Sequence, residues 1–168
     1  YTRLDLEKIV SLKPDLCIAL KDGNPIEIIN RLESLNIPVF ATDPRNLDGG
    51  LETIREIGLS LNSKDKAELL VNKLQARIDK VKSLVATIDR KPRVFFQIGI
   101  TPIVSAGTNT FIHELITLAG GENVSAGATP YPRFSREQVL GLAPEVFIIT
   151  SMARGGGFEE MKAWWSQW

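Results

Sequence analysis

Two segments of the chain carry the same polar side chains at the same spacing. Residues 1–20 and 131–150 are identical at six of twenty aligned positions. Three identities fall at the polar end, where core packing does not demand them: Tyr1/Tyr131, Arg3/Arg133 and Glu7/Glu137. Aromatic faces, guanidinium groups and carboxylates can bind a ligand or a partner, but the repeat holds no nucleophile beside a base. Its residue types therefore indicate recognition rather than catalysis.

Other motifs add no catalytic chemistry. The glycine clusters at 107–110 (GTNT) and 154–157 (RGGG) lack the lysine and hydroxyl of a phosphate-binding loop. The sequence contains no G-x-S-x-G elbow and no metal-hydrolase helix. His113 has no Cys or acidic residue at metal-ligand spacing, so it is typical of an ordinary helix histidine and no metal site is expected. An enzyme is the weaker rival function, and a non-transport interaction or sensor module is the other rival.

Composition narrows the class of protein further. The 168 residues include 20 basic and 20 acidic groups, and this zero net charge argues against a nucleic-acid partner. A hydrophobic share of 43% can supply a core, yet no apolar run reaches the roughly 20 residues that span a bilayer. The single cysteine, Cys17, cannot form an internal disulfide and is expected to be a buried small side chain in LCIAL.

The first repeated segment must be positioned by alternating helices and strands. Asp5 is the expected N-cap of a short helix, and Pro14 ends it. The elements expected next are a strand at 16–20, a helix at 25–35, a strand at 38–42 and a helix at 47–59. A strand–helix–strand order favours a parallel sheet.

A long amphipathic helix is predicted over 63–89, with Ser63 as its cap. Its apolar residues recur every three or four positions without Gly or Pro. Such a helix is about 40 Å long and is best placed across two lobes.

The second repeated segment lies in a second α/β region. A strand at 93–97, an extended piece at 103–107 and a helix at 110–119 precede a long loop at 122–134. Ser135 then caps the repeated helix, with Gln138 at the capping-box position, and a strand follows at 146–150. A final helix is expected from about Phe158, with Trp164, Trp165 and Trp168 as a packing cluster. The predicted fold is α/β: two lobes with parallel sheets, at 1–61 and 91–168, joined by one rigid helix within 62–90.

The ordered series of segments resembles a known family. The segments are LEKIVSLKPDLCIAL, VFFQIGITPIVSAG, FIHELITLAGGENV and YPRFSREQVLGLAPEVFIIT. Together they are similar to the substrate-binding proteins of ABC importers for vitamin B12, iron–siderophore complexes and haem, above all to the vitamin B12-binding members. The resemblance covers nearly the whole chain and implies two α/β lobes, one long connecting helix and a ligand held between the lobes.

The resemblance also implies roles for the repeated residues. Tyr1 and Tyr131 match positions where vitamin B12-binding members place one aromatic side chain per lobe against the corrinoid; the alternative is a Tyr that packs its own loop. Glu7 and Glu137 match the acidic residues, one per lobe, that dock such proteins onto arginines of a permease dimer. The alternative to docking is that each Glu only stabilises its own helix, by interacting favourably with the helix dipole.

Two positions depart from the vitamin B12-binding pattern. Leu20 stands where those members have Trp, and Val104 stands where they have Phe. Both remain candidate ligand contacts, but this chain lacks the two aromatic side chains that those members have at these positions. Arg133, with Arg45 and Arg154, could contact an anionic ligand, although surface arginine is the commoner case. Cobalamin is the first expected ligand, and a ferric siderophore or haem is the alternative; no intrinsic cofactor is expected.

Against this family the chain looks truncated at both ends. Members carry further residues before Tyr1 and after Trp168. The resemblance implies a periplasmic or otherwise extracytoplasmic, monomeric protein that delivers its chelate to an ABC importer permease. A lipid anchor in a preceding segment is an open alternative.

Overall fold

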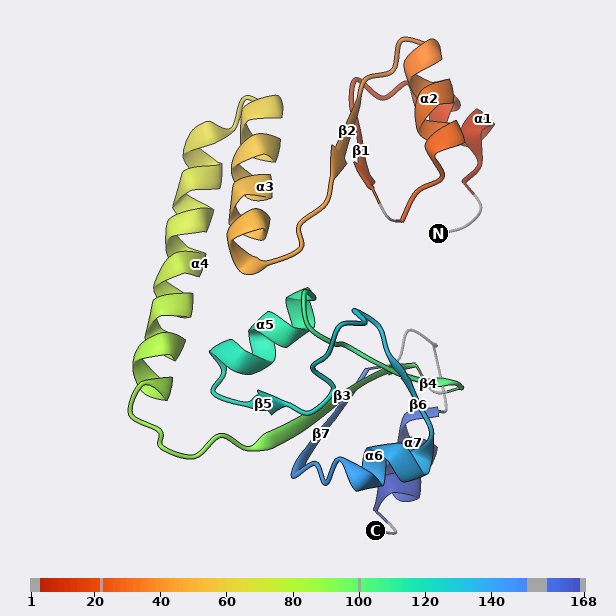
Figure 1. Cartoon of the computed structure of the whole chain (residues 1–168). Coiled ribbons are helices and arrows are strands. Elements are labelled where there is room, and N and C mark those ends of the chain that lie inside the picture. Colours follow the sequence, from red (N-terminus) through yellow and green to blue (C-terminus); the bar gives the residue numbers. More distant parts are fainter. Residues whose placement is uncertain (1–3, 22, 100, 151–156, 167–168) are drawn as a thin grey trace.

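Two α/β lobes flank a pair of long helices in the computed structural model (Figure 1). The structure describes residues 4–21, 23–99, 101–150 and 157–166. The N-terminal lobe contains α1 (Leu6–Ser11), β1 (Cys17–Leu20), α2 (Ile26–Ser34) and β2 (Val39–Thr42). The helix pair α3 (Leu47–Ser60) and α4 (Lys64–Val85) follows. The C-terminal lobe contains β3 (Arg93–Gly99), β4 (Ile103–Ser105), α5 (Phe111–Leu118), β5 (Glu122–Asn123), β6 (Arg133–Phe134), α6 (Arg136–Gly141), β7 (Val146–Ile149) and α7 (Gly157–Trp165).

The N-terminal lobe forms as its sequence pattern predicts. Asp5 caps α1, because its carboxylate accepts a hydrogen bond from the backbone N–H of Lys8 at 3.0 Å. β1 and β2 pair in parallel across α2, with Cys17 opposite Val39. Ile29 and Leu32 of α2 are buried, whereas α1 has no buried residue. Cys17 is half-buried rather than fully buried as expected, because the described part of this lobe is only one sheet and two helices.

The connecting helix α4 is one unbroken element that packs along α3 (Figure 1). It begins at Lys64 and ends at Val85, four residues before the predicted end at Asp89, so its length is about 33 Å. Ser63 occupies the N-cap position without a side-chain capping bond, so the predicted cap is wrong in its chemistry. Gly58 lets the helices approach closely, because an added Cβ would lie 2.3 Å from the Cβ of Ala67.

The C-terminal sheet is mixed, which corrects the prediction of purely parallel sheets. β3 pairs in parallel with β5 and β7 but antiparallel with β4, which in turn pairs antiparallel with β6. β3 and β4 are separated by residues 100–102, a connection too short for the crossover that parallel strands need. β5 and β6 are two-residue strands within the segment predicted as a long loop, where no periodicity could reveal them.

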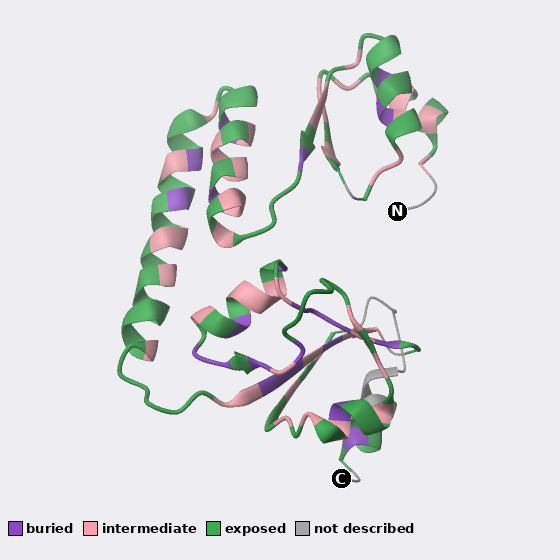
Figure 2. Ribbon diagram, viewed as in Figure 1, coloured by how far each residue is buried: buried purple, intermediate pink, exposed green. Residues whose placement is uncertain are grey.

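Aromatic packing forms the core of the C-terminal lobe. Phe95, Ile103, Val139 and Trp165 make a buried cluster from four elements of the chain. Figure 2 shows buried segments, in purple, in several elements of this lobe. The ring of Phe147 lies 4.8 Å from that of Trp165, whose indole N–H donates to Gln97 at 2.9 Å. The predicted tryptophan cluster is therefore correct for Trp165 and Trp164, whose ring centroids lie 5.5 Å apart in an edge-to-face contact. Trp164 is 39% exposed and Trp168 lies outside the described residues.

Candidate functional site

Three of the predicted ligand-contacting residues come together on one edge of the C-terminal sheet. Val104 of β4 and Arg133 of β6 are direct partners in the antiparallel ladder. Tyr131 lies two residues before the start of β6, and 57% of its surface is exposed. A half-buried Val, an exposed Arg and an exposed Tyr thus form one short strip. A neighbouring aromatic face and cation suit a flat ligand with an anionic group.

The loop that carries Tyr131 is tied to β4 on both sides of the tyrosine. The backbone N–H of Ser105 donates to the carbonyl of Pro132 at 3.0 Å, and that of Gly107 donates to the carbonyl of Pro130 at 2.7 Å. Gly107 also has to be a glycine, because an added Cβ would lie 2.1 Å from the carbonyl oxygen of Thr129. These anchors hold the backbone of an exposed aromatic residue in place. Sequence reasoning missed this role of Gly107, although GTNT was noticed for its glycine.

A buried polar network stands behind the same loop. Ser105 donates to the hydroxyl of Ser125 at 2.7 Å, and the amide of Asn123 donates to the carbonyl of Ala106 at 2.8 Å. The Asn123 amide also lies 3.1 Å from Nδ1 of His113 on α5, and its oxygen accepts from the N–H of Ser125 at 3.0 Å. His113 is therefore part of a structural network that links α5 to the loop.

Leu20 lies in the other lobe, at the end of β1. Its side chain is 56% exposed, and its N–H donates to Asn24 at 2.8 Å in the turn that follows. Leu20 is therefore an exposed apolar residue in a different sheet from Val104 and Arg133. Tyr1 lies outside the described residues, so the structure places only one of the two predicted tyrosines.

Glu7 and Glu137 occupy equivalent positions in the two lobes. Each lies in the first turn of its helix, α1 or α6, and each is exposed. The pKa of Glu137 is lowered, first by a hydrogen bond from its own backbone N–H and then by the Ser135 hydroxyl, with a smaller contribution from Arg136. A Glu carboxylate is charged at neutral pH even at its ordinary pKa of 4.5, and the lowered pKa of Glu137 extends its charged state further into acid.

The candidate arginines differ in their partners. Arg45 forms an ion pair with Asp43, with Nε 2.8 Å from Oδ1, so Asp43 partly neutralises its charge. The side chain of Arg133 makes no hydrogen bond or ion pair with any residue that the structure describes. Arg154 lies outside the described residues. Within those residues no group of three His, Cys, Asp or Glu side chains could hold a metal ion.

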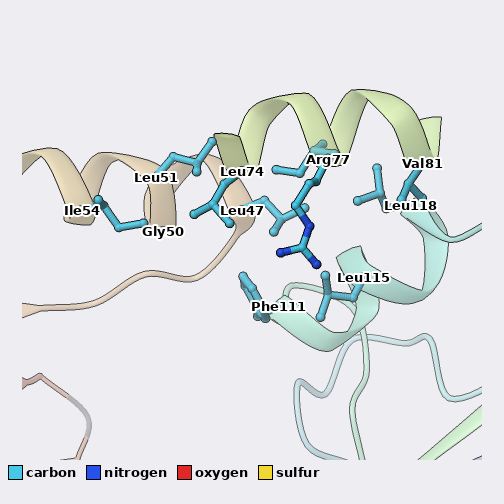
Figure 3. A pocket seen from close by; sticks show the side chains of 11 residues that line it. Leu47, Gly50, Leu51, Ile54, Leu74, Arg77, Val81, Phe111, Leu115 and Leu118 are labelled. Carbon is cyan, nitrogen blue, oxygen red and sulfur yellow. The ribbon is translucent and has the colours of Figure 1, made fainter. Parts of the chain in front are cut away.

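An apolar groove of about 450 Å³ lies where α3, α4 and α5 meet (Figure 3). Its lining consists of Leu47, Gly50, Leu51, Ile54, Leu74, Arg77, Ile78, Val81, Phe111, Leu115 and Leu118. Sequence reasoning missed the groove, because its walls come from three separate helices. The carboxylate of Glu114 on α5 accepts a hydrogen bond from the N–H of Leu47 at 2.7 Å at the same junction.

Comparison with known proteins places this two-lobed structure in a family. Residues 1–163 match the family model described as periplasmic binding protein. The chain belongs to the periplasmic binding protein family. Two vitamin B12-binding proteins are similar in sequence. That of Salmonella typhimurium is 33% identical over 163 residues and that of Vibrio campbellii is 31% identical over 165 residues. Each alignment covers 96% of this chain and 60% of the relative.

Solved structures of this periplasmic binding protein family share the fold. The periplasmic haem-binding protein of Roseiflexus sp. RS-1 superposes with a TM-score of 0.81 at 29% identity, over 88% of this chain and 58% of that one. The periplasmic vitamin B12-binding protein of Vibrio cholerae gives 0.77 at 25% identity, over 99% and 65%. The chain therefore spans about three fifths of the length of these relatives. None of the helices in the described ranges is long and apolar enough for a membrane crossing.

Proposed function

We propose that this chain is part of an extracytoplasmic solute-binding protein that captures cobalamin or a similar metal chelate between its lobes. The observation that carries the proposal is the strip of Val104, Arg133 and Tyr131, on a backbone anchored to β4, in a chain of this family. An exposed aromatic ring on a fixed loop binds a flat ligand at low entropic cost. Leu20, with Tyr1, supplies the contacts from the other lobe. The protein acts by binding and not by catalysis.

Delivery to an ABC importer permease would use Glu7 and Glu137. Both carboxylates are exposed in the first turn of equivalent helices in separate lobes, so a two-fold symmetric permease could receive one from each. The proposed protein is a periplasmic or lipid-anchored monomer.

A haem or ferric-siderophore ligand is the alternative within the same class. It is favoured by Leu20 and Val104, which provide aliphatic rather than aromatic walls, and by the exposed Arg133 beside Tyr131. A guanidinium group pairs well with a propionate or catecholate. The structural neighbours include haem-binding and vitamin B12-binding proteins, so both ligands have to be tested.

A titration with cyanocobalamin, haemin and a ferric catecholate siderophore, followed by tryptophan fluorescence and calorimetry, tests the capture function. We expect saturable binding of one of the three. Tyr131→Ala should weaken it about tenfold through the lost aromatic contact, and Arg133→Gln should weaken haemin or siderophore binding selectively. Arg31→Gln, at an exposed position of α2, is the matched control. An interaction or sensor module would bind none of the three, and that outcome would overturn the proposal.

The docking role is tested with importer in proteoliposomes. The double variant Glu7→Lys/Glu137→Lys should lose stimulation of importer ATPase activity while its chelate affinity stays unchanged. Glu27→Lys/Glu159→Lys, two exposed carboxylates on α2 and α7, is the control. Full stimulation by the first double variant would contradict docking, and loss of chelate binding in it would contradict the separation of the two sites.

A further inference from the structure

One carboxylate joins the helix pair to the C-terminal lobe. Glu114 of α5 accepts a hydrogen bond from the N–H of Leu47, the first residue of α3, at 2.7 Å. The two residues are 67 positions apart, and the bond is partly buried. It therefore links two bodies that approach each other in Figure 1.

The bond satisfies a specific need at the start of α3. The first backbone N–H groups of a helix have no partner within it. Asn46 caps α3 by accepting from the N–H of Gly49 at 2.7 Å, which leaves the N–H of Leu47 to another acceptor. Glu114 supplies that acceptor and places a negative charge at the positive end of the α3 dipole. The same carboxylate lies in the first turn of its own helix α5, so it is favourable for two dipoles.

Apolar packing at this junction is incomplete. The groove of about 450 Å³ between α3, α4 and α5 runs beside the bond, with Leu47 facing Phe111 and Leu115 across it (Figure 3). Close-packed side chains would define one relative position, but an open groove does not. α4 also contacts α5, and Val85 packs against Gly120 at the end of α5. To these apolar contacts the charge-assisted hydrogen bond of Glu114 adds a directional one that favours a particular orientation.

Movement of α5 would carry the candidate ligand strip with it. Thr110, the N-cap of α5, donates to the carbonyl of Gly107 at 2.8 Å, and Gly107 is bonded to Pro130 beside Tyr131. On the other side, α3 follows β2 after residues 43–46, and β2 pairs with β1, which ends at Leu20. Glu114 thus lies on the path between the two candidate ligand surfaces.

We propose that Glu114 is a positioning residue that sets the orientation of the C-terminal lobe against α3 and, with it, the gap between Leu20 and Tyr131. The consequence for a ligand rests on the proposed function, whereas the orientation itself does not. Glu114 touches no ligand in this proposal.

Spin-label distance measurements without ligand test the orientation. In a Cys17→Ala background, labels at Glu56→Cys on α3 and Lys162→Cys on α7 report the distance distribution, since both sites are exposed. Glu114→Ala should broaden or shift the distribution. Glu114→Gln keeps an acceptor oxygen but loses the charge, so it should lie between Glu114→Ala and the parent. Glu122→Ala removes a carboxylate of the same lobe that pairs with Arg93 at 2.7 Å, and it should leave the distribution unchanged.

Stopped-flow dissociation of cyanocobalamin or haemin, whichever binds, tests the consequence. Glu114→Ala should raise the dissociation rate constant about five- to tenfold through weakened pre-organisation, with Glu114→Gln intermediate and Glu122→Ala unchanged. An unaltered distance distribution in Glu114→Ala, with parental circular dichroism, would overturn the proposal. If circular dichroism shows that Glu114→Ala has lost helix, the distance distribution of Glu114→Gln is compared with that of the parent instead, and an unaltered distribution would again overturn the proposal. A changed distribution in a chain that binds neither chelate would support the positioning role and count against the proposed function.

Discussion

The two repeated modules adopt the same local structure in different surroundings. α1 and α6 are both six residues long, and the strands that follow them, β1 and β7, are both four. The residues that precede the matched prolines, Lys13 and Ala143, both have positive φ angles, 49° and 46°. β1 and β7 each pair in parallel with another strand but belong to separate sheets. Cap, helix, left-handed residue, proline and strand are therefore local features that either lobe can reproduce.

The two modules differ in how far their residues are buried. Val139 of α6 is fully buried against Phe95, Ile103 and Trp165, whereas α1 has no buried residue. The strands differ less, since Ile18 of β1 is 50% exposed and the matched Ile148 of β7 is 40% exposed. The difference teaches that the local sequence specifies the module, while the elements packed against it decide how much stability it contributes.

The largest difference is expected from truncating matched core positions. Val139→Ala should lower the free energy of unfolding by about 2 kcal/mol, because it leaves a cavity in a closed cluster. Ile9→Ala, at the matched half-buried position, should cost less than about 1 kcal/mol. Urea denaturation followed by circular dichroism measures both. Equal losses of unfolding free energy in the two variants would contradict the difference in burial between the modules.

Removing the two N-caps should have a smaller effect of the same sign. Ser135→Ala removes the hydroxyl half of a capping box, while the backbone N–H of residue 135 can still donate to Gln138. It should cost about 1 kcal/mol, because α6 is packed into the core. Asp5→Ala removes one bond from an exposed helix that can fray alone, so a few tenths of a kcal/mol are expected. Urea unfolding gives the global values, and amide exchange of α1 should accelerate in Asp5→Ala. A larger global loss in Asp5→Ala than in Ser135→Ala would be inconsistent with this view.

Glycine at the left-handed positions should act alike in both modules. Lys13→Gly and Ala143→Gly relieve an unfavourable backbone conformation but add unfolded-state entropy, so each should raise the free energy of unfolding by about 0.5 kcal/mol. Thermal and urea unfolding measure the effect. Leu61→Gly, at a position with negative φ, is a control that should destabilise. Opposite signs for Lys13→Gly and Ala143→Gly would show that the shared backbone geometry is not a local feature.

The smallest effect concerns the acid limb of stability. The folded-state pKa of Glu137 is lowered from its ordinary value of 4.5, so ionised Glu137 favours the folded state. Its contribution is present above that ordinary value and disappears as the pH falls through the lowered pKa. Glu137→Gln should therefore lie slightly below the parent in unfolding free energy at about pH 6 and converge with it in acid, below the lowered pKa. A constant offset at both pH values would contradict this origin.

Much of the fold could be predicted from local signals. The caps at Asp5 and Ser135, the helix stop before Pro14 and the unbroken pattern of α4 each rest on residues close together in the chain. The mixed sheet could not be predicted in this way, since β5 and β6 exist only through pairing with β3 and β4. A strand of two residues is too short to show a periodic pattern of apolar side chains. Ser63 does not cap α4 through its side chain, because its hydroxyl donates to the carbonyl of Leu61 instead.

The candidate site also has a part that could be predicted from the sequence and a part that could not. The residue types of Tyr131, Arg133 and Val104 could be selected from the sequence, and their ligand role remains a prediction. The ladder that places Val104 opposite Arg133, the anchor at Gly107 and the bond from Glu114 to Leu47 became visible only in three dimensions.

The amino-acid sequence alone determined the helices and the longer strands, the caps at Asp5 and Ser135, and that one module occurs twice, because these depend on interactions within a few residues. Tertiary structure decided the sheet order, the buried cluster around Phe95 and the junction at Glu114. Those features need contacts between residues far apart in the chain, and such contacts form only when packing brings the elements together.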